Sequence, residues 1–96
     1  MLSFLPKNPS ETMQELRSRF RERRRSLGYT QKELSERSGV SLGSLKRFES
    51  SGQIALESLL RLALVLECLE DFEGVCVEKE KGFESIDEIL SEGRKA

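Results

Sequence analysis

TQKELSERSGVSLGSLKRFES, from Thr30 to Ser50, is the stretch that decides the fold, because it contains two helical patterns with a break between them. Thr30 is followed three residues later by Glu33, a capping-box pattern that predicts the start of a short helix. Gly39 tolerates the left-handed conformation in which many helices end. A second helix is predicted over residues 42–50. Two short helices joined by a tight turn are therefore expected.

The second of these helices has an apolar side and a polar side. Ser41 is its predicted N-cap, and Leu45 and Phe48 are predicted to be buried. The opposite side carries residues that solvent or a ligand can reach, namely Leu42, Gly43, Lys46 and Arg47. This arrangement is typical of a helix-turn-helix, whose second helix enters the major groove of DNA.

The spacing of apolar residues predicts further helices on both sides of this unit. The first begins at Ser10 or Thr12 and ends at Gly28, another covers residues 56–69, and a short one covers residues 70–73. Residues 56–69 are apolar on more than one stripe, which predicts the core on one side and a second subunit on the other. A short tail helix would carry Ile86, Ile89 and Leu90 on one face. The predicted class is all-α.

The charge is divided along the chain although the net charge is only -1. Residues 16–53 hold ten Lys and Arg against four Glu, a net of +6, so the remaining residues sum to -7. A basic block centred on a helix-turn-helix favours phosphate binding. Residues 54–96 hold eleven acids against five bases, which predicts that this part points away from DNA. The alternative for the arginines is an ordinary solvated helix face.

Several classes of protein are not supported by the sequence. The chain lacks histidine, a CxxC pair and a glycine-rich phosphate loop, so we expect no enzymatic activity, no metal and no cofactor. The longest apolar run, residues 62–66, is far shorter than the ~20 residues of a membrane-spanning helix. Without a secretion signal, the expected location is the cytoplasm, with the nucleoid. Cys68 and Cys76 are expected to be inert free thiols.

The segments TQKELSERSGVS and LKRFE resemble the XRE class of phage-type repressors, and the resemblance extends over about residues 13–73. It implies a five-helix, lambda-repressor-like DNA-binding domain over residues 11–73, preceded by a lead (1–10) and followed by a tail (74–96). It also implies a small residue, Ser35, at the crossing of the two central helices. By the same resemblance, Arg24 pairs with Glu49 and ties the recognition helix to the rest of the domain.

The predicted DNA contacts fall into two groups. Arg47 is expected to read guanine and Leu42 to meet a thymine methyl, with Gly43 and Lys46 beside them in the major groove. The residues expected at the DNA backbone are Gln31, Ser41, Ser44, Arg23 and Arg25. For Gln31 and Ser44, an ordinary role as polar residues near a helix start is the open alternative.

A narrower resemblance concerns the segments LPKNPSETMQELRSRFRERRRSLGYTQ, SLGSLKRFESSGQIALESLLRLALVLECLEDFE and SIDEIL, which look similar to HipB-type antitoxins. It implies a HipA-like serine/threonine kinase toxin as partner. A standalone XRE-family repressor is the alternative. A homodimer on a pseudo-palindromic operator is expected from the helix-turn-helix itself. The residues expected at the dimer or partner surface are Leu62, Val65, Leu66, Leu69, Phe72, Val75, Val77, Ile86, Ile89 and Leu90.

Overall fold

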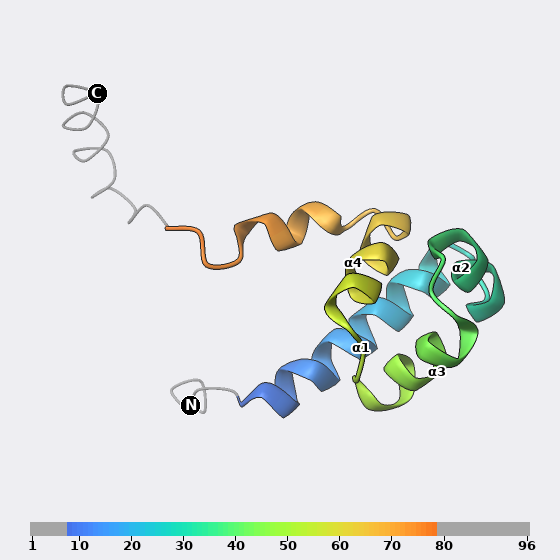
Figure 1. Ribbon diagram of the computed structural model, residues 1–96, viewed down its shortest axis with the longest axis horizontal. Coiled ribbons are helices and arrows are strands. Elements are labelled where there is room, and N and C mark those ends of the chain that lie inside the picture. The colour runs from blue at the N-terminus through green and yellow to red at the C-terminus, as the bar shows by residue number, and fades with distance from the viewer. Residues whose placement is uncertain (1–7, 79–96) are drawn as a thin grey trace, which may run out of the picture.

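The computed structural model describes residues 8–78, which form four α-helices and one 3-10 helix (Figure 1). The elements are α1 (Pro9–Ser26), α2 (Gln31–Ser38), α3 (Leu42–Ser51), α4 (Leu56–Val65) and the 3-10 helix η2 (Leu69–Gly74). Within this range there is no strand, and the predicted all-α, five-helix class is confirmed. The tail helix expected with Ile86, Ile89 and Leu90 lies outside the described residues.

The two central helices begin at the predicted caps. The Thr30 hydroxyl accepts a hydrogen bond from the Glu33 amide at 3.0 Å, and the Glu33 carboxylate accepts one from the Thr30 amide at 2.9 Å. Ser41 caps α3 by accepting from the Ser44 amide at 3.1 Å. Between the two helices, Gly39 has a φ of 78°, a left-handed conformation that L-residues other than glycine rarely adopt. The predicted helix-turn-helix is therefore confirmed.

Two predicted helix boundaries were wrong. Helix α1 starts at Pro9 rather than at Ser10 or Thr12, because Asn8 accepts from the Glu11 amide at 2.8 Å and proline suits the first helical position. Helix α4 ends at Val65 rather than at Leu69.

The early end of α4 has a backbone cause. The Cys68 amide donates to the Ala63 carbonyl at 2.9 Å and the Glu67 amide to the Leu64 carbonyl at 3.2 Å, which is a Schellman motif. Glu67, with a φ of 62°, occupies the left-handed position where glycine is usual. Because glycine is absent there, the sequence pattern did not indicate a helix end.

The core lies where α1, α2, α3 and α4 meet, and η2 packs against it. The rings of Phe20 and Phe48 contact edge to face, with centroids 5.5 Å apart, and Phe72 of η2 lies 6.3 Å from Phe20. Leu62 and Leu66 are 0% exposed in this core. Their predicted role at a dimer or partner surface is therefore wrong, because their side chains are fully used inside one copy of the chain.

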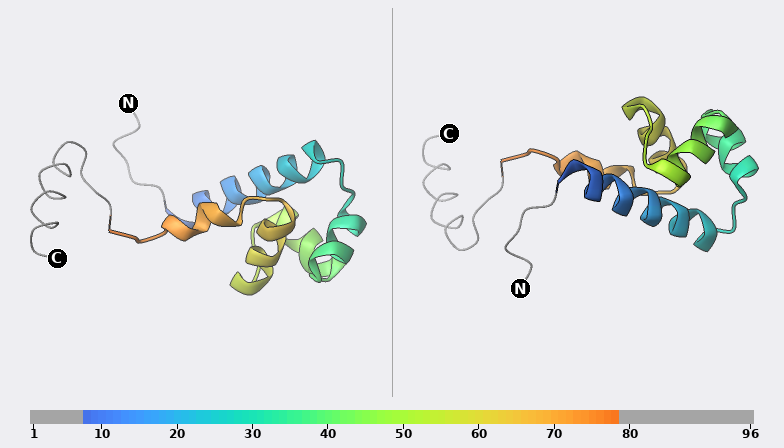
Figure 2. Two further views of the ribbon diagram at one scale, coloured as in Figure 1. Left: turned by 90° about the horizontal axis from the view of Figure 1, so that it is seen from above. Right: turned by 90° about the horizontal axis from the view of Figure 1, so that it is seen from below.

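Helix α1 supports the rest of the domain from one side. Both views in Figure 2 place α2, α3 and α4 on the same side of α1. The end of α3 packs closely on α1, because a Cβ atom on Gly52 would lie only 3.1 Å from the carbonyl oxygen of Met13. α1 therefore fixes the position of the recognition helix directly.

Candidate nucleic-acid interface

Helix α3 buries one side and leaves the other free. Leu45, Phe48 and Glu49 are buried, while the four predicted base-reading residues occupy positions i, i+1, i+4 and i+5 of the helix. Of these four, Leu42 is partly buried and the others are exposed: Gly43, Lys46 and Arg47. No atom would lie within 4 Å of a Cβ added to Gly43, so another molecule can approach the backbone closely there.

A basic groove of about 590 Å³ runs beside the free face of α3. Its walls come from α1, α3 and the start of α2, and its charged residues are five cations and one carboxylate. The lining residues are Arg17, Arg21, Arg24, Arg25, Thr30, Gln31, Lys46, Glu49 and Ser50. We call this set the basic groove. Its excess of positive charge attracts anions such as phosphates.

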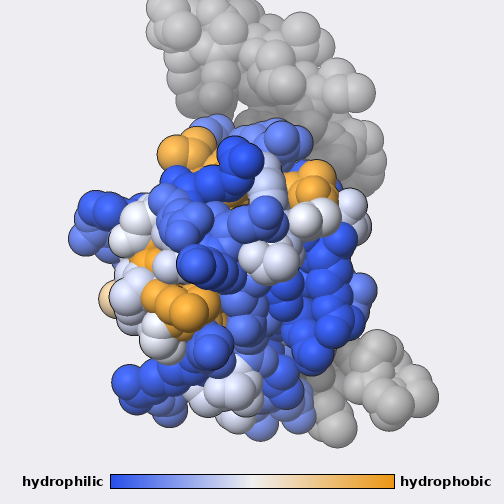
Figure 3. Space-filling model, turned by 90° about the vertical axis from the view of Figure 1, so that its right-hand side faces the viewer, coloured by the Kyte–Doolittle hydropathy of each residue, from blue (hydrophilic) through white to orange (hydrophobic). Residues whose placement is uncertain are grey.

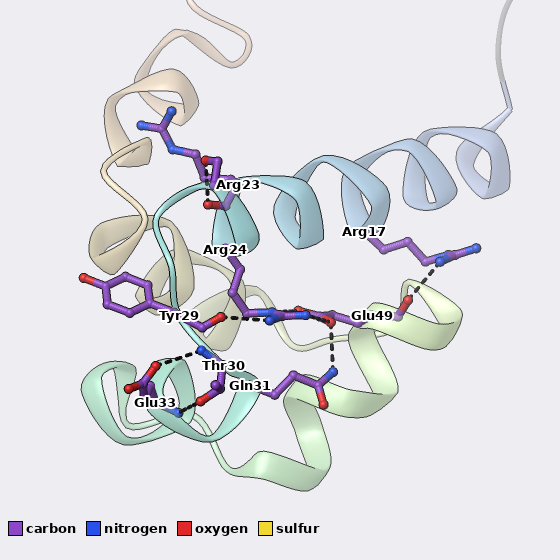
Figure 4. A network of polar contacts seen from close by, with 9 residues as sticks. Arg17, Arg23, Arg24, Tyr29, Thr30, Gln31, Glu33 and Glu49 are labelled. Carbon is purple, nitrogen blue, oxygen red and sulfur yellow. Dashed lines mark hydrogen bonds and ion pairs between the residues drawn. The ribbon is translucent and has the colours of Figure 1, made fainter.

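The carboxylate of the groove is neutralised by a buried ion pair (Figure 4). Arg24 donates from Nε to Glu49 Oε2 at 2.7 Å and from Nη2 to Oε1 at 3.0 Å, and the two residues are only 8% and 6% exposed. A third nitrogen, Nη1, donates to the Tyr29 carbonyl at 2.9 Å. The predicted Arg24–Glu49 pair is thus present as a bidentate contact that joins α1 to α3.

Two more side chains attach to the same part of α3. Gln31 Nε2 donates to Glu49 Oε1 at 2.8 Å, and Arg17 Nη1 donates to the Glu49 carbonyl at 2.8 Å. The C-terminal turn of α3 also receives a hydrogen bond from Gln14 Nε2 to the Ser51 carbonyl at 3.1 Å. The contacts of Arg17 and Gln14 satisfy carbonyls that the helix itself leaves without partners, and that of Gln31 adds a donor to the Glu49 carboxylate. The recognition helix is therefore held in one orientation relative to α1 and α2.

Arg23 differs from the other arginines of α1, although the sequence grouped it with the DNA-backbone contacts. Its Nε donates to the Leu66 carbonyl at 2.7 Å and its Nη2 to the Glu67 carbonyl at 3.2 Å. Figure 4 shows Arg23 pointing away from the Arg24–Glu49 pair. Because its guanidinium caps the C-terminus of α4, we leave Arg23 out of the DNA-contacting set.

The side chains of three other predicted contact residues, Ser41, Ser44 and Arg47, have hydrogen-bond partners within the protein, whereas that of Arg25 has none among the described residues. Ser41 Oγ donates to Ser44 Oγ at 3.0 Å, and Arg47 Nη2 donates to Gln53 Oε1 at 2.7 Å. Arg25 is exposed and lines the basic groove. The Ser35 hydroxyl donates to the Val40 carbonyl at 2.6 Å, across the turn between α2 and α3.

Sequence reasoning missed two groove residues, Arg17 and Arg21. The signal was present in their spacing, since residues 17, 21, 24 and 25 lie on one side of a helix at about 100° per residue. Arg23 falls about 100° from Arg24, on the other flank of the apolar stripe. The position around the helix, rather than membership of the arginine run, decides which arginines reach the groove.

The surface at the α2 and α3 end of the molecule is mostly polar. Figure 3 shows this end as largely hydrophilic, with separate small apolar patches. Monomeric proteins expose such scattered apolar residues routinely. Because the apolar patches on this end are separate, they offer no continuous apolar surface for a protein partner. The end therefore suits a charged, hydrophilic ligand.

The opposite part of the molecule has a second, more apolar groove of about 670 Å³ between α1 and η2. Phe72 and Val75 line it, and Val75 and Val77 are 63% and 55% exposed. Val65, Leu69 and Phe72 are partly buried. Of the predicted dimer or partner residues, these five thus remain accessible within the described range.

The described residues contain no group of three or more His, Cys, Asp or Glu that could hold a metal ion. None of the helices among them is long and apolar enough to cross a bilayer. Cys68 is partly buried, and Cys76 is exposed. Burial and the nearby carboxylate of Asp71 raise the pKa of the Cys68 thiol above its usual range.

The sequence matches the family model described as helix-turn-helix over residues 20–72, which is more than half of the chain. The chain belongs to this family, and the XRE-type resemblance is confirmed at that level. The family consists of DNA-binding transcriptional regulators, so the chain is a DNA-binding domain of this type. No curated protein and no solved structure matches the chain. The narrower resemblance to HipB-type antitoxins is not confirmed.

Proposed function

We propose that the protein is a sequence-specific transcriptional repressor that binds a pseudo-palindromic operator as a homodimer. The observation that carries this proposal is the basic groove directly beside the free face of α3. A helix-turn-helix needs one surface for base edges and a neighbouring one for phosphates. The free face of α3 and the basic groove lie side by side in this way. The half-sites are expected about one helical turn, ~34–36 Å, or a multiple of it apart.

Each surface has a distinct task in this proposal. Arg47 and Lys46 reach base edges in the major groove, and Leu42 contacts a thymine methyl. Arg21 and Arg25 project from α1 toward the phosphates that border the groove. The backbone contacts are completed by Gln31, Ser41 and Ser44 at the starts of α2 and α3, where free amides favour anions.

The buried contacts of Glu49 maintain the geometry that this recognition requires. Gln31 is bonded to Glu49, so the residue expected at the phosphate backbone and the recognition helix are held in register. Arg17 lies at the inner wall of the basic groove and holds the C-terminal turn of α3. A rigid support of this kind lets base contacts form without further ordering of the protein.

Binding measurements at several salt concentrations test the two assigned tasks. Arg21→Ala is expected to weaken binding to operator and random DNA equally and to lower the salt slope by about 0.9 for the lost phosphate contact. Arg47→Ala is expected to weaken operator binding by about 10- to 100-fold and random DNA much less. Arg19→Ala, on the other flank of α1, serves as the matched control. Equal losses on both DNAs for Arg47→Ala would contradict its base-reading role.

We further propose that the repressor is an antitoxin that represses its own operon and binds a HipA-like serine/threonine kinase. The support is the resemblance to HipB-type antitoxins, together with the exposed Val75 and Val77 beside the apolar groove. A kinase held by this surface would remain on the operator, close to the nucleoid, and strengthen repression by avidity.

A kinase-like gene beside the gene for this chain would supply the protein for the test. Val75→Asp with Val77→Asp is expected to weaken kinase binding and leave operator binding intact, as measured by calorimetry and by DNA titration. If the kinase binds both forms equally, the surface assignment is wrong. If no adjacent kinase binds at all, the standalone repressor is the correct reading.

A further inference from the structure

Helix α4 carries an apolar stripe that the core does not use. Leu56 and Leu64 are 68% and 63% exposed, although leucine side chains favour burial, and Leu60 between them is partly exposed. The three residues follow a four-residue spacing, so they form one continuous stripe along the helix. We call them the α4 stripe. The sequence predicted a second subunit on one side of this helix, but it named none of these three leucines for that surface.

We propose that the α4 stripe is the surface on which two copies of this chain dimerise, with the two α4 helices packed antiparallel. This inference rests on the proposed function only in that a pseudo-palindromic operator calls for a two-fold dimer. It goes further by assigning the contact to Leu56, Leu60 and Leu64. The core of one copy cannot cover these residues, whereas the buried Leu62 and Leu66 are unavailable to a partner.

The charged residues beside the stripe can pair between the two copies when the α4 helices lie antiparallel. Glu57 and Arg61 lie on the same flank of the stripe and form an exposed ion pair of 2.7 Å, with side chains 77% and 52% exposed. In a two-fold pair centred on Leu60, Leu56 lies opposite Leu64 of the second copy. Glu57 of one copy and Arg61 of the other are then offset by about two residues, ~3 Å along the helix axis. Both copies gain the same two cross-pairs, as an isologous contact requires.

The stripe also has a suitable position relative to the recognition helix. The first turn of α4 and α3 line a common cleft, which includes Arg47 of α3 and Ala55 and Ser58 at the start of α4. A two-fold axis at α4 therefore keeps the recognition helices of both copies close to that axis. Three leucines supply only part of the ~1,200 Å² buried in a stable dimer, so we expect dissociation in the micromolar range.

Sedimentation velocity on the full chain tests the surface. The wild-type chain is expected to form dimers in the micromolar range, and Leu60→Glu and Leu64→Glu are each expected to weaken the dimer by about 100-fold. Leu64 is well exposed, so its variant should keep the wild-type melting temperature, which excludes unfolding as the cause. Val77→Glu, on the other apolar surface, is the matched control and should leave the dimer unchanged.

A charge exchange tests the antiparallel orientation. Glu57→Arg and Arg61→Glu alone should each disfavour the dimer, because like charges then face each other. Mixing the two variants should restore dimers that contain one copy of each, which native mass spectrometry detects. Homodimers that persist in both single variants, a dimer lost in Val77→Glu but not in Leu60→Glu, or a wild-type chain that stays monomeric would each overturn the proposal.

The proposed dimer surface and the proposed DNA binding can fail independently of each other. Leu60→Glu is expected to bind a single half-site with wild-type affinity while losing the cooperative gain on a full operator. If the wild-type chain binds no DNA, the proposed function fails, and sedimentation still decides whether the α4 stripe forms the dimer.

Discussion

Removing the carboxylate of Glu49 is expected to destabilise the domain more than any surface substitution. In Glu49→Ala, the buried guanidinium of Arg24 keeps only the Tyr29 carbonyl as a partner, and Gln31 loses its acceptor. Breaking one side of a buried ion pair costs about 3–5 kcal/mol, because an uncompensated charge remains in the interior. A domain of this size has a total stability of roughly 5–10 kcal/mol. The substitution should therefore remove about half of it.

Thermal unfolding followed by circular dichroism measures this loss. At about 4–8 °C per kcal/mol for a small domain, the melting temperature of Glu49→Ala should fall by at least ~12 °C. The matched control is Glu15→Ala, which removes an exposed pair with Arg19 whose side chains are 38% and 67% exposed. That pair is worth about 0.5 kcal/mol or less.

A double variant identifies the cause of the loss. Arg24→Met with Glu49→Leu removes both charges and keeps apolar volume, so it should be more stable than Glu49→Ala alone. A melting temperature of Glu49→Ala within a few degrees of the wild type would refute the reasoning. It would mean that the two side chains are solvated and that α3 is held by the aromatic core alone.

Three further outcomes are expected. Arg23→Ala should lower stability by about 1–2 kcal/mol, since it removes the cap of the α4 carbonyls, and should leave the salt slope of DNA binding unchanged. Gly43→Ala should raise the melting temperature, because alanine favours the helix by up to ~1 kcal/mol and meets no neighbour, but should weaken operator binding if DNA approaches the backbone there. Iodoacetamide at neutral pH should modify exposed Cys76 before Cys68, whose pKa is raised by burial; equal rates by mass spectrometry would contradict this.

The helix-turn-helix could be predicted because its signals are local. Thr30 with Glu33 and Ser41 with Ser44 form caps within four residues of chain, and Gly39 takes the left-handed conformation that ends α2. Such contacts depend on sequence separation alone, and no tertiary arrangement is needed to recognise them.

The end of α4, and which of its leucines are buried, could not be predicted in the same way. Periodicity shows that the helix has more apolar residues than one stripe needs, but it does not state which stripe meets the core. Burial of Leu62 and Leu66 depends on how α4 packs against α2 and on the rest of the core cluster, and these contacts join residues far apart in the chain. The exposed leucines therefore became visible only in the folded molecule.

The arginine run of α1 shows how one charged segment acquires several tasks. Relative to buried Phe20, and at about 100° per residue, Arg17 and Arg24 lie ~40–60° to one side and Arg23 about 60° to the other. The two arginines on the first side reach Glu49 of α3, and Arg23 reaches the end of α4. Arg21 and Arg25 lie farther from the core, at about 100–140°, and have only the open groove before them. Charge counting treats all five alike, whereas the helical angle assigns three to the scaffold and leaves two for phosphates. A variant that exchanges Arg21 with Ser26 would keep the net charge and move the cation about 140° around α1, to the flank of Arg23. A lower DNA affinity at unchanged stability would show that the position of the cation, and not charge alone, binds the DNA.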